Sequence, residues 1–284
     1  MDKLTNIKFI RDLLSGFGFT FSKQMGQNFL INPSVCPRMA QLCGCENIGV
    51  LEIGPGIGVL TKELAKLAAQ VVAVELDERL RPVLDVTLKD CQNVQIRFGD
   101  ILKLDLKELI DSFAGMDVVV CANLPYYITS PVIMRLLESR LPFRSITVMV
   151  QKEAAARLCA KPGTRACGAV TLAVQYYATA QKCFDVDRGS FLPAPNVDSS
   201  VIRLDIRQSP AVQVQNEAFF FKVIKAAFGQ RRKTLPNALS AGLGLEKPII
   251  SDALSACGVR PAARAEELDL EAFASVADAL LQLQ

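Results

Sequence analysis

The chain has 284 residues, half of them hydrophobic, with 32 basic and 29 acidic side chains, nine cysteines and no histidine. The absence of histidine excludes Ser-His and Cys-His nucleophile pairs, a histidine general base and histidine metal ligands. Because no C-x-x-C pair occurs, we expect neither a metal site nor a disulfide framework, and the free thiols indicate a reducing, cytoplasmic location. No apolar run approaches the roughly 18 residues of a membrane-spanning helix, and no secretory signal is evident, so we expect no membrane partner.

Between residues 48 and 150, short apolar runs alternate with amphipathic helical patterns, which predicts βαβ units and a mostly parallel sheet. The predicted strands cover 48–53, 69–76, 94–98, 117–124 and 145–150, and the predicted helices cover 59–68, 78–89, 106–113 and 130–139. Two further strands are predicted at 168–178 and 198–206. Because no long crossover helix separates them, they indicate an antiparallel edge to the sheet.

After residue 206 the pattern becomes helical, with helices predicted at 217–229, 233–243, 247–258 and 268–283. We therefore expect an α/β chain of two domains. The first, residues 1–206, is a Rossmann-like domain that carries a basic N-terminal extension. The second, residues 207–284, is a small all-α domain.

Three glycines, Gly54, Gly56 and Gly58, follow the first strand of this pattern in the segment LEIGPGIGVL. Val59 stands where the dinucleotide-binding fingerprint needs glycine or alanine. Such a turn lets the backbone approach a nucleoside that carries no pyrophosphate. A tight strand-to-helix connection without a ligand would need similar glycines, so the turn alone is weak evidence.

Acidic residues at the ends of three successive strands make the evidence more specific. Glu52 precedes the glycine turn, Glu75 ends the next strand and Asp100 follows the strand after it. Glu75 is placed to accept hydrogen bonds from both ribose hydroxyls of a nucleoside, and Asp100 from the exocyclic amine of an adenine, with Ile101 against the ring. Each could instead cap the following helix. Together with the glycines they predict a methyltransferase that uses S-adenosyl-L-methionine and releases S-adenosyl-L-homocysteine.

The segment Asn123-Leu124-Pro125-Tyr126 follows the next strand and resembles the Asn/Asp-Pro-Pro-Tyr/Phe signature of amino methyltransferases that act on adenine or cytosine. An exocyclic base amine is a poor nucleophile because its lone pair is delocalised into the ring. The Asn123 side-chain oxygen and the carbonyl of Leu124 or Pro125 can accept its two N–H bonds and orient that lone pair, while Tyr126 stacks on the base. The structural alternative is a turn built around Pro125.

Taken as a whole, the chain resembles the small-subunit ribosomal RNA adenine dimethyltransferase family, the kasugamycin-sensitivity methyltransferases of bacteria. The resemblance rests on nine blocks in order: KQMGQNFLIN (23–32), EIGPGIGVLT (52–61), AVELD (73–77), GDIL (99–102), NLPYYIT (123–129), VQKEAAARL (150–158), FLPAPNVDSSVIRL (191–204), FGQRRKTLPNAL (228–239) and RAEEL (264–268). It implies a Rossmann-like methyltransferase domain with a helical C-terminal domain. The implied activity is N6,N6-dimethylation of two adjacent adenosines near the 3′ end of 16S ribosomal RNA in the small (30S) subunit.

The resemblance also implies roles for individual residues. The cofactor would be contacted by Asn28 and Leu30 and by Gly54, Glu75, Asp100 and Asn123. Phe191 would stack on the target adenine opposite Tyr126. A plain core aromatic in front of a rigid proline loop is the alternative for Phe191.

A basic segment lies near the expected domain junction, where residues 222–247 hold six basic side chains against one acidic. Arg231, Arg232 and Lys233 are predicted to start a helix and to spread around its first turn, and Lys222 and Lys225 extend the patch. Such a cluster is suited to contacts with RNA phosphates. The alternative is an ordinary solvated surface.

Two other functions fit parts of the sequence. An erythromycin-resistance-type 23S ribosomal RNA methyltransferase would share the cofactor motifs, and a non-catalytic nucleic-acid-binding factor could keep the fold without the reaction. The FGQRRKTL and RAEEL blocks favour the small-subunit enzyme over the first, and the intact Glu75, Asp100 and NLPY motif argue against the second. We expect a monomer.

Overall fold

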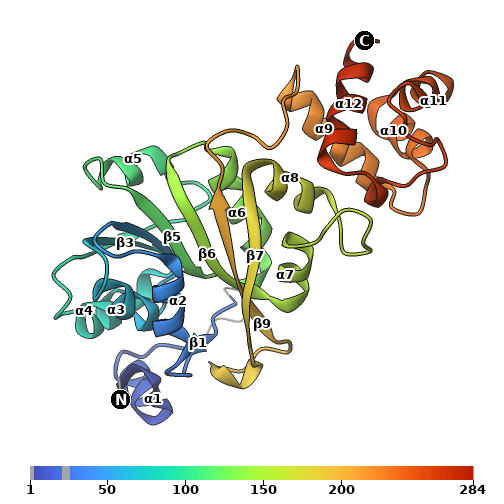
Figure 1. Ribbon diagram of the computed structural model, residues 1–284. Coiled ribbons are helices and arrows are strands. Elements are labelled where there is room, and N and C mark those ends of the chain that lie inside the picture. The colour runs from blue at the N-terminus through green and yellow to red at the C-terminus, as the bar shows by residue number, and fades with distance from the viewer. Residues whose placement is uncertain (1–2, 21–25, 284) are drawn as a thin grey trace. The chain divides into compact units, whose positions relative to one another are not determined.

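The computed structural model of the chain describes residues 3–20 and 26–283 (Figure 1). The start of the KQMGQNFLIN block, Lys23 to Met25, lies outside the described residues. A search of the described helices finds none with the length and hydropathy needed to cross a bilayer.

The centre of the described chain is a seven-stranded sheet with the order β4-β3-β2-β5-β6-β9-β7. The strands are β2 (Gly49–Ile53), β3 (Gln70–Glu75), β4 (Val94–Phe98), β5 (Val118–Asn123), β6 (Phe143–Gln151), β7 (Ala178–Val186) and β9 (Ser199–Ile206). The strands from β2 to β6 pair in parallel, and β9 runs antiparallel to β6. This confirms the predicted α/β fold with a mostly parallel sheet. β9 and β7 form one side of the described sheet, with β7 as the outermost strand.

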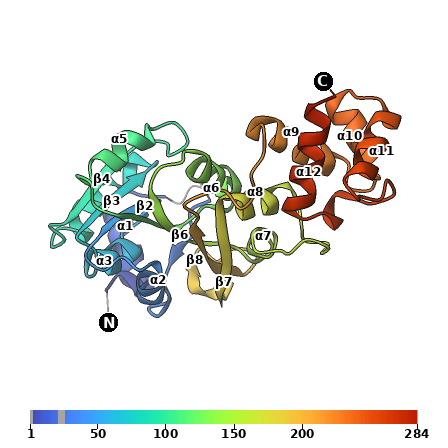
Figure 2. The same cartoon turned by 45° about the horizontal axis from the view of Figure 1, so that its top comes forward.

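Helices cover both faces of this sheet, with α2 and α3 on one face and α5 and α6 on the other (Figure 2). The first unit holds α1 (Ile7–Gly16), α2 (Val35–Cys43), α3 (Val59–Ala65), α4 (Arg81–Thr87), α5 (Leu106–Asp111), α6 (Thr129–Glu138) and the start of α7 (Lys152–Leu158). Short 3-10 turns lie at Lys3–Thr5, Glu78–Leu80, Tyr126–Ile128 and Arg188–Ser190. Every residue of β2 is buried, as expected for a strand covered on both faces, whose sequence reads as a continuous apolar run.

The order of the strands places a crevice at one edge of the sheet. From β2 the chain moves outward through β3 to β4 and then returns to β5 on the other side of β2. In such sheets, ligands bind beyond the carboxyl ends of the strands at the point where the order reverses. That point lies between the residues that follow β2 and those that end β5.

The strand predicted at 168–178 is wrong, because most of this segment forms the helix α8 (Ala169–Tyr177) and a strand, β7, begins only at Ala178. Leu172, Val174, Tyr176 and Tyr177 of this helix are all buried. A helix that is apolar on nearly all sides has no helical period for a sequence pattern to reveal. Its β-branched and aromatic residues then favour a strand.

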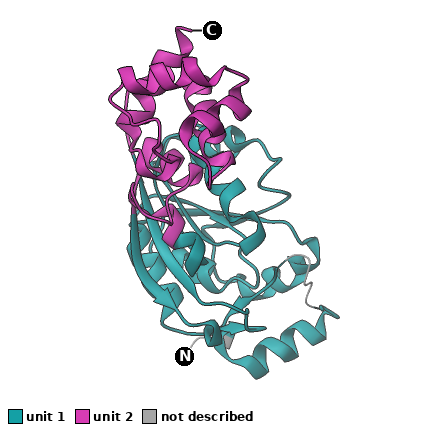
Figure 3. Cartoon of the chain, turned by 90° about the vertical axis from the view of Figure 1, so that its right-hand side faces the viewer, with its two compact units in different colours: residues 1–155, 181–206 teal, residues 156–180, 207–284 magenta. Residues whose placement is uncertain are grey.

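The chain divides into two compact units (Figure 3): residues 1–155 with 181–206, and residues 156–180 with 207–284. The expected division at residue 206 would place 156–180 in the first unit. The structure groups this segment with the helical unit, where the hydroxyls of Tyr176 and Tyr177 both donate to the carboxylate of Glu217, at 3.0 and 2.9 Å.

The second unit contains the end of α7, the helix α8, the first residues of β7, and four C-terminal helices: α9 (Glu217–Gly229), α10 (Leu235–Leu243), α11 (Lys247–Ala256) and α12 (Leu270–Leu281), with a 3-10 turn at Ala265–Glu267. These helices lie where the sequence predicts them. Gly244 ends α10 with φ +75°, as a C-terminal glycine should, whereas Gly242 lies inside the helix. A Cβ at Gly242 would approach Ala226 Cβ to 2.4 Å, so the close contact of α9 with α10 requires glycine there.

Candidate functional site

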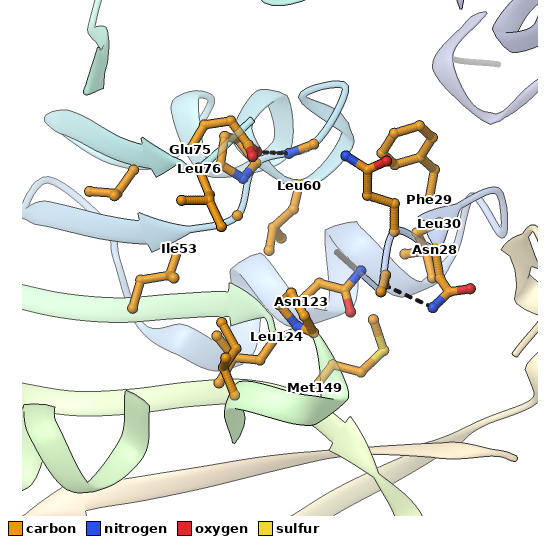
Figure 4. A pocket seen from close by; sticks show the side chains of 18 of the residues that line it. Asn28, Phe29, Leu30, Ile53, Leu60, Glu75, Leu76, Asn123, Leu124 and Met149 are labelled. Carbon is orange, nitrogen blue, oxygen red and sulfur yellow. Dashed lines mark hydrogen bonds between the residues drawn. The ribbon is translucent and has the colours of Figure 1, made fainter. Parts of the chain in front are cut away.

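A cavity that is partly open to solvent lies at the carboxyl edge of the sheet, within the first unit. Figure 4 shows residues approaching it from three sides: Glu75 and Leu76 at the end of β3, Asn123, Leu124 and Met149 from the ends of β5 and β6, and Asn28, Phe29 and Leu30 from the N-terminal loop. The structure therefore brings together in one cavity the six residues expected to bind a cofactor and the five expected to act on the acceptor. Those eleven assignments cover ten residues, Asn123 belonging to both sets: Asn28, Leu30, Gly54, Glu75, Asp100, Asn123, Leu124, Pro125, Tyr126 and Phe191.

The glycine turn between β2 and α3 forms one wall of the cavity. Gly54 and Gly56 adopt left-handed φ angles of +72° and +59°, which L side chains rarely adopt. A Cβ on Gly56 would lie 3.2 Å from the Phe29 ring, so a side chain here would crowd the N-terminal loop. Glycine thus opens the backbone of this turn to a ligand.

Glu75 ends β3 with only 6% of its surface exposed. Its Oε2 accepts a hydrogen bond from Gly56 N at 3.1 Å, and its Oε1 accepts one from Asp77 N at 2.9 Å. Burial raises the pKa of Glu75, and the backbone hydrogen bonds act in the opposite direction. Each carboxylate oxygen has two lone pairs, so the group can accept further hydrogen bonds from a diol.

Asp100 lies in a tight turn after β4, with 29% of its side chain exposed. Its Oδ1 accepts a hydrogen bond from Leu102 N at 2.9 Å, which fixes the carboxylate at the rim of the cavity. Ile101, next to it, is buried and also lines the cavity. An apolar side chain beside a carboxylate is an arrangement that fits an adenine ring and its exocyclic amine.

Glu52 does not join Glu75 and Asp100, although the sequence places it beside the glycine turn. The side chain is 1% exposed and does not line the cavity. Burial raises the pKa of Glu52 to about 8, while the Thr61 hydroxyl lowers it. Because side chains of a strand alternate between its two faces, Glu52 points into the packed layer next to α3 instead of toward the ligand.

The segment from Asn123 to Tyr126 forms the opposite wall. Asn123 ends β5 in register with Met149 of β6, and Leu124 N donates to Met149 O at 3.2 Å. The Tyr126 hydroxyl lies 2.8 Å from the hydroxyl of the buried Ser199, and burial raises the pKa of this phenol. The backbone of the segment and the ring of Tyr126 are therefore held in place before any ligand binds.

The N-terminal loop closes the remaining side through a two-stranded ribbon. In it β1 (Phe29–Leu30) pairs antiparallel with β8 (Phe191–Leu192), so that Leu30 lies opposite Phe191. Asn28 Nδ2 donates to Gly26 O at 3.0 Å, which leaves its side-chain oxygen available for a ligand. Phe191 lines the cavity but is only 3% exposed. Ile31 N donates to Ser190 O at 2.8 Å, so residues expected to contact the cofactor and the acceptor base lie side by side on one ribbon.

Sequence reasoning missed the contacts that hold this loop. Gln27 Nε2 donates to Asp77 Oδ2 at 2.7 Å, and the Arg79 guanidinium forms two hydrogen bonds with the same carboxylate. Arg79 also lies over the Phe19 ring, 5.0 Å from its centroid. These hydrogen bonds lower the pKa of Asp77, with Arg79 the largest cause. Gln27 and Asp77 adjoin residues that the motifs singled out, but nothing in the sequence pairs them across 50 positions.

With this geometry in place, comparison with known proteins is informative. The family model described as "Ribosomal RNA adenine dimethylase" matches residues 18–282. The chain belongs to the ribosomal RNA adenine dimethylase family. A relative from Anoxybacillus flavithermus, "Ribosomal RNA small subunit methyltransferase A", is 50% identical over 278 residues, which cover 95% of this chain and 94% of the relative. A relative of the same name from Streptococcus mutans is 46% identical over 287 residues, 99% of each chain.

Solved structures agree with this membership of the adenine dimethylase family. The dimethyladenosine transferase of Plasmodium falciparum superposes with a TM-score of 0.74 at 26% identity, over 89% of this chain and 96% of that one. The 23S rRNA methyltransferase ErmE superposes with a TM-score of 0.67 at 24% identity, over 90% and 100% of the two chains, and shows a shared fold. The predicted Rossmann-like methyltransferase fold and the predicted family are confirmed.

The cavity suits the methyl donor of the adenine dimethylase family, S-adenosylmethionine. The buried Glu75 carboxylate has unused acceptor capacity at the strand end, and the glycines of the turn provide backbone surface without side chains. Glu75 would hold the ribose, Asp100 and Ile101 the adenine, and Asn28, Leu30, Gly54 and Asn123 the methionine end. The predicted enzyme class and cofactor, with S-adenosylhomocysteine as product, are confirmed by the family.

The basic segment lies in the second unit, and the helical conformation predicted for Arg231, Arg232 and Lys233 is wrong. α9 ends at Gly229 and α10 begins at Leu235, so that Arg231, Arg232 and Lys233 form the turn between them. Lys233 N donates to Gln230 O at 2.8 Å in this turn. Pro236 at the start of α10 explains the boundary, because proline fits the first helical turn and disfavours helix before it.

The three side chains of this turn are exposed but not equivalent. Arg231 Nη2 donates to the carbonyls of Arg165 and Cys167, at 2.6 and 3.2 Å, and so fixes the loop that precedes α8. The exposed cations Lys161 and Arg165 belong to this loop and are thereby held near the basic turn. Lys222 and Lys225 are exposed on α9 at i, i+3 spacing, which puts them on one face.

Proposed function

We propose that the chain transfers methyl groups from S-adenosylmethionine to N6 of two adjacent adenosines near the 3′ end of 16S ribosomal RNA, two to each. The observation that carries this proposal is the cavity that Asn123 and Tyr126 line together with Glu75 and Asp100. A nucleoside-binding edge and an amine-binding turn then share one reaction site. The name of the relatives, "Ribosomal RNA small subunit methyltransferase A", supports the small-subunit RNA as substrate.

The reaction needs orientation of the amine more than its deprotonation. When bound, S-adenosylmethionine supplies an electrophilic methyl group on a sulfonium whose leaving group is a neutral thioether. Asn123 Oδ1 and the carbonyl of Leu124 or Pro125 accept the two N–H bonds of the adenine amine, which directs its lone pair away from the ring. As the nitrogen gains a fourth bond it becomes acidic, and the proton passes to water.

Aromatic side chains hold the base. The hydrogen bond between Tyr126 and Ser199 fixes one ring at the cavity, and the ribbon pairing fixes Phe191 beside Leu30. A base taken out of its own stack gains stacking on such faces, which is sequence-tolerant and is worth about 1–3 kcal/mol per base. The two acceptors then select a base that carries an exocyclic amine and exclude uracil, and in the second transfer the N6-methylamine still has one N–H bond to donate.

The helical second unit supplies the RNA contact in this proposal, with Arg231, Arg232, Lys233, Lys222 and Lys225 facing phosphates of the small (30S) subunit or its precursor. Phosphate contacts position an RNA without reading its bases, which suits a cluster of exposed cations outside the reaction cavity. We further propose that the enzyme acts in the cytoplasm as a monomer. All nine cysteines are free thiols, which supports a reducing compartment.

Incubation with methyl-labelled S-adenosylmethionine tests the proposed function. Unmethylated small subunits are expected to take up four methyl groups each, recovered as N6,N6-dimethyladenosine at two adjacent positions near the 3′ end of 16S RNA. Large subunits, incubated in parallel, are expected to take up none. Label confined to large subunits would instead indicate an erythromycin-resistance-type enzyme, and no label in either would indicate a non-catalytic factor.

Substitution of Arg232 and Lys233 by glutamine is expected to weaken binding to unmethylated small subunits about ten-fold, with a shallower dependence of log Kd on log salt, since each phosphate contact contributes about 0.7–0.9 to that slope. Arg231 is kept, because its hydrogen bonds to Arg165 and Cys167 carry a structural role as well. Filter binding between about 50 and 200 mM salt measures both quantities.

The control for this pair is a double variant with the same loss of charge, Lys89→Gln with Lys107→Gln. Both lysines are exposed in the first unit and lie outside the basic segment 222–247 and the basic N-terminal extension. Their loss is expected to leave the salt slope unchanged. An equal dependence of log Kd on log salt in the unchanged protein and in both double variants would show that the basic turn is an ordinary solvated surface.

A further inference from the structure

Arg135 on α6 makes two hydrogen bonds to a segment outside its own helix. Its Nη1 donates to Leu102 O at 2.7 Å, and its Nη2 donates to Leu104 O at 2.6 Å. Both acceptors belong to the turn that follows β4, more than 30 positions earlier in the sequence. A planar guanidinium can donate two parallel hydrogen bonds in this way, whereas the ammonium of lysine is a single point charge.

The turn that Arg135 holds is the one that carries Asp100 and Ile101. Asp100 O accepts from Lys103 N and Leu104 N at 2.8 and 2.9 Å, and Asp100 Oδ1 accepts from Leu102 N. The turn is thus a small closed unit, and its two outward carbonyls at Leu102 and Leu104 are the ones that Arg135 binds. Moving those carbonyls would move the Asp100 carboxylate.

α6 also starts at the acceptor-binding wall. The 3-10 turn Tyr126–Ile128 leads directly into α6 at Thr129, and the Thr129 hydroxyl donates to Pro125 O at 3.4 Å. Val132, Ile133, Leu136 and Leu137 of the helix are buried, which fixes it against the sheet. Arg135 therefore connects the turn on the adenine side of the cavity to the helix that begins at Tyr126.

We propose that Arg135 is a positioning residue for the adenine of S-adenosylmethionine: by binding the carbonyls of Leu102 and Leu104 it holds Asp100 and Ile101 where they recognise that ring. The inference rests on the proposed adenine-binding role of Asp100 and is independent of which RNA is methylated. Arg135 itself does not line the cavity and touches neither ligand.

The test is calorimetry of S-adenosylhomocysteine binding to the full chain. Arg135→Met is expected to weaken binding roughly ten-fold or more, because hydrogen bonds from a charged donor are among the strong ones. Arg135→Lys, which keeps the charge and can reach one carbonyl, is expected to recover part of this loss. At saturating cofactor the rate of methyl transfer is expected to stay within about two-fold of the unchanged protein, since a positioning role in cofactor binding raises KM and not the chemical barrier.

A second ligand separates adenine recognition from general damage to the fold. S-Inosylhomocysteine carries a carbonyl oxygen in place of the adenine amine, so the unchanged protein is expected to bind it more weakly than S-adenosylhomocysteine. This preference is expected to shrink in Arg135→Met and to stay unchanged in the control Arg97→Met, because a general loss of stability would weaken the binding of both ligands alike. Arg97 is an exposed arginine on β4, the strand that leads into the same turn.

Two outcomes overturn the inference. One is an Arg135→Met protein that binds S-adenosylhomocysteine as tightly as Arg97→Met does. The other is an unchanged protein that binds both ligands equally, because the turn then does not recognise the adenine amine. Neither outcome bears on the methylation of small subunits, which the labelling experiment measures separately.

Discussion

Asn123→Ala is expected to lower the rate of methyl transfer to small subunits about 100- to 1000-fold, the range found when one oriented acceptor or donor is removed from a reacting group. Cofactor affinity is expected to fall by a much smaller factor, because Asn123 is one of several groups at the methionine end of the cofactor, whereas its contact with the amine matters mainly in the transition state. The backbone at this position is fixed by the pairing of β5 with β6 and by the hydrogen bond from Leu124 N to Met149 O. Truncating the side chain therefore leaves the wall of the cavity in place.

Single-turnover rates with saturating cofactor, together with calorimetry of S-adenosylhomocysteine, measure the two parts of this result. Asn123→Asp keeps an acceptor oxygen in the same place and is expected to retain more activity than the alanine variant. Asn237→Ala serves as a control, because this asparagine makes one local hydrogen bond to Thr234 in the second unit. An alanine variant at 123 with the full rate would show that the amine is held by other groups.

Glu75→Ala is expected to weaken binding of S-adenosylmethionine and S-adenosylhomocysteine at least about 100-fold, since two ribose hydroxyls would each lose a hydrogen bond to a charged acceptor worth about 1.5–3 kcal/mol. The variant also frees Gly56 N and Asp77 N, which the carboxylate now binds. Glu75→Gln keeps the shape and one acceptor oxygen, so it is expected to lie between the two proteins. Calorimetry at pH 8 measures all three.

The pKa of Glu75 adds a dependence on pH with a definite sign. Burial raises this pKa above the ordinary value of a glutamate, and only the charged form accepts hydrogen bonds from both hydroxyls. As the pH falls, cofactor affinity is therefore expected to decrease, and to begin decreasing at a higher pH than an ordinary glutamate would give. The variant Glu75→Gln should lack this component. Glu78→Gln, a change at a mostly exposed carboxylate three positions on, is expected to bind as tightly as the unchanged protein at every pH.

Much of the cavity could be predicted from the sequence because parallel strands carry their carboxyl ends to one edge. Gly54, Glu75, Asp100 and Asn123 each follow or end a successive apolar run, so that a parallel sheet necessarily brings them to the same side. Glu52 shows the limit of this reasoning, because its position beside the turn gave no sign of which face of β2 it occupies. One position along a strand separates the ligand side from the packed side.

Helical and loop assignments depended on what surrounds each segment. α8 has strand-like composition and becomes a helix in a unit where Tyr176 and Tyr177 bind Glu217. Arg231 to Lys233 lie in a turn because the following helix starts only at Leu235, with Pro236 next to it. In α8 local propensity was ambiguous and tertiary contacts decided the outcome, whereas in the basic turn the deciding signal, Pro236, is local.

The sequence by itself determined the class of fold, the cofactor edge and the acceptor motif, because these follow from local periodicity and from residue types at strand ends. Only the tertiary structure decided which distant side chains hold those parts in position. Asp77 binds Gln27 across 50 positions, Arg135 binds the turn after β4, and Ile31 N binds Ser190 O in the ribbon that places Leu30 beside Phe191. The physical reason is that a hydrogen bond between distant residues requires a particular packing of the elements between them, and no local pattern in the sequence encodes that packing.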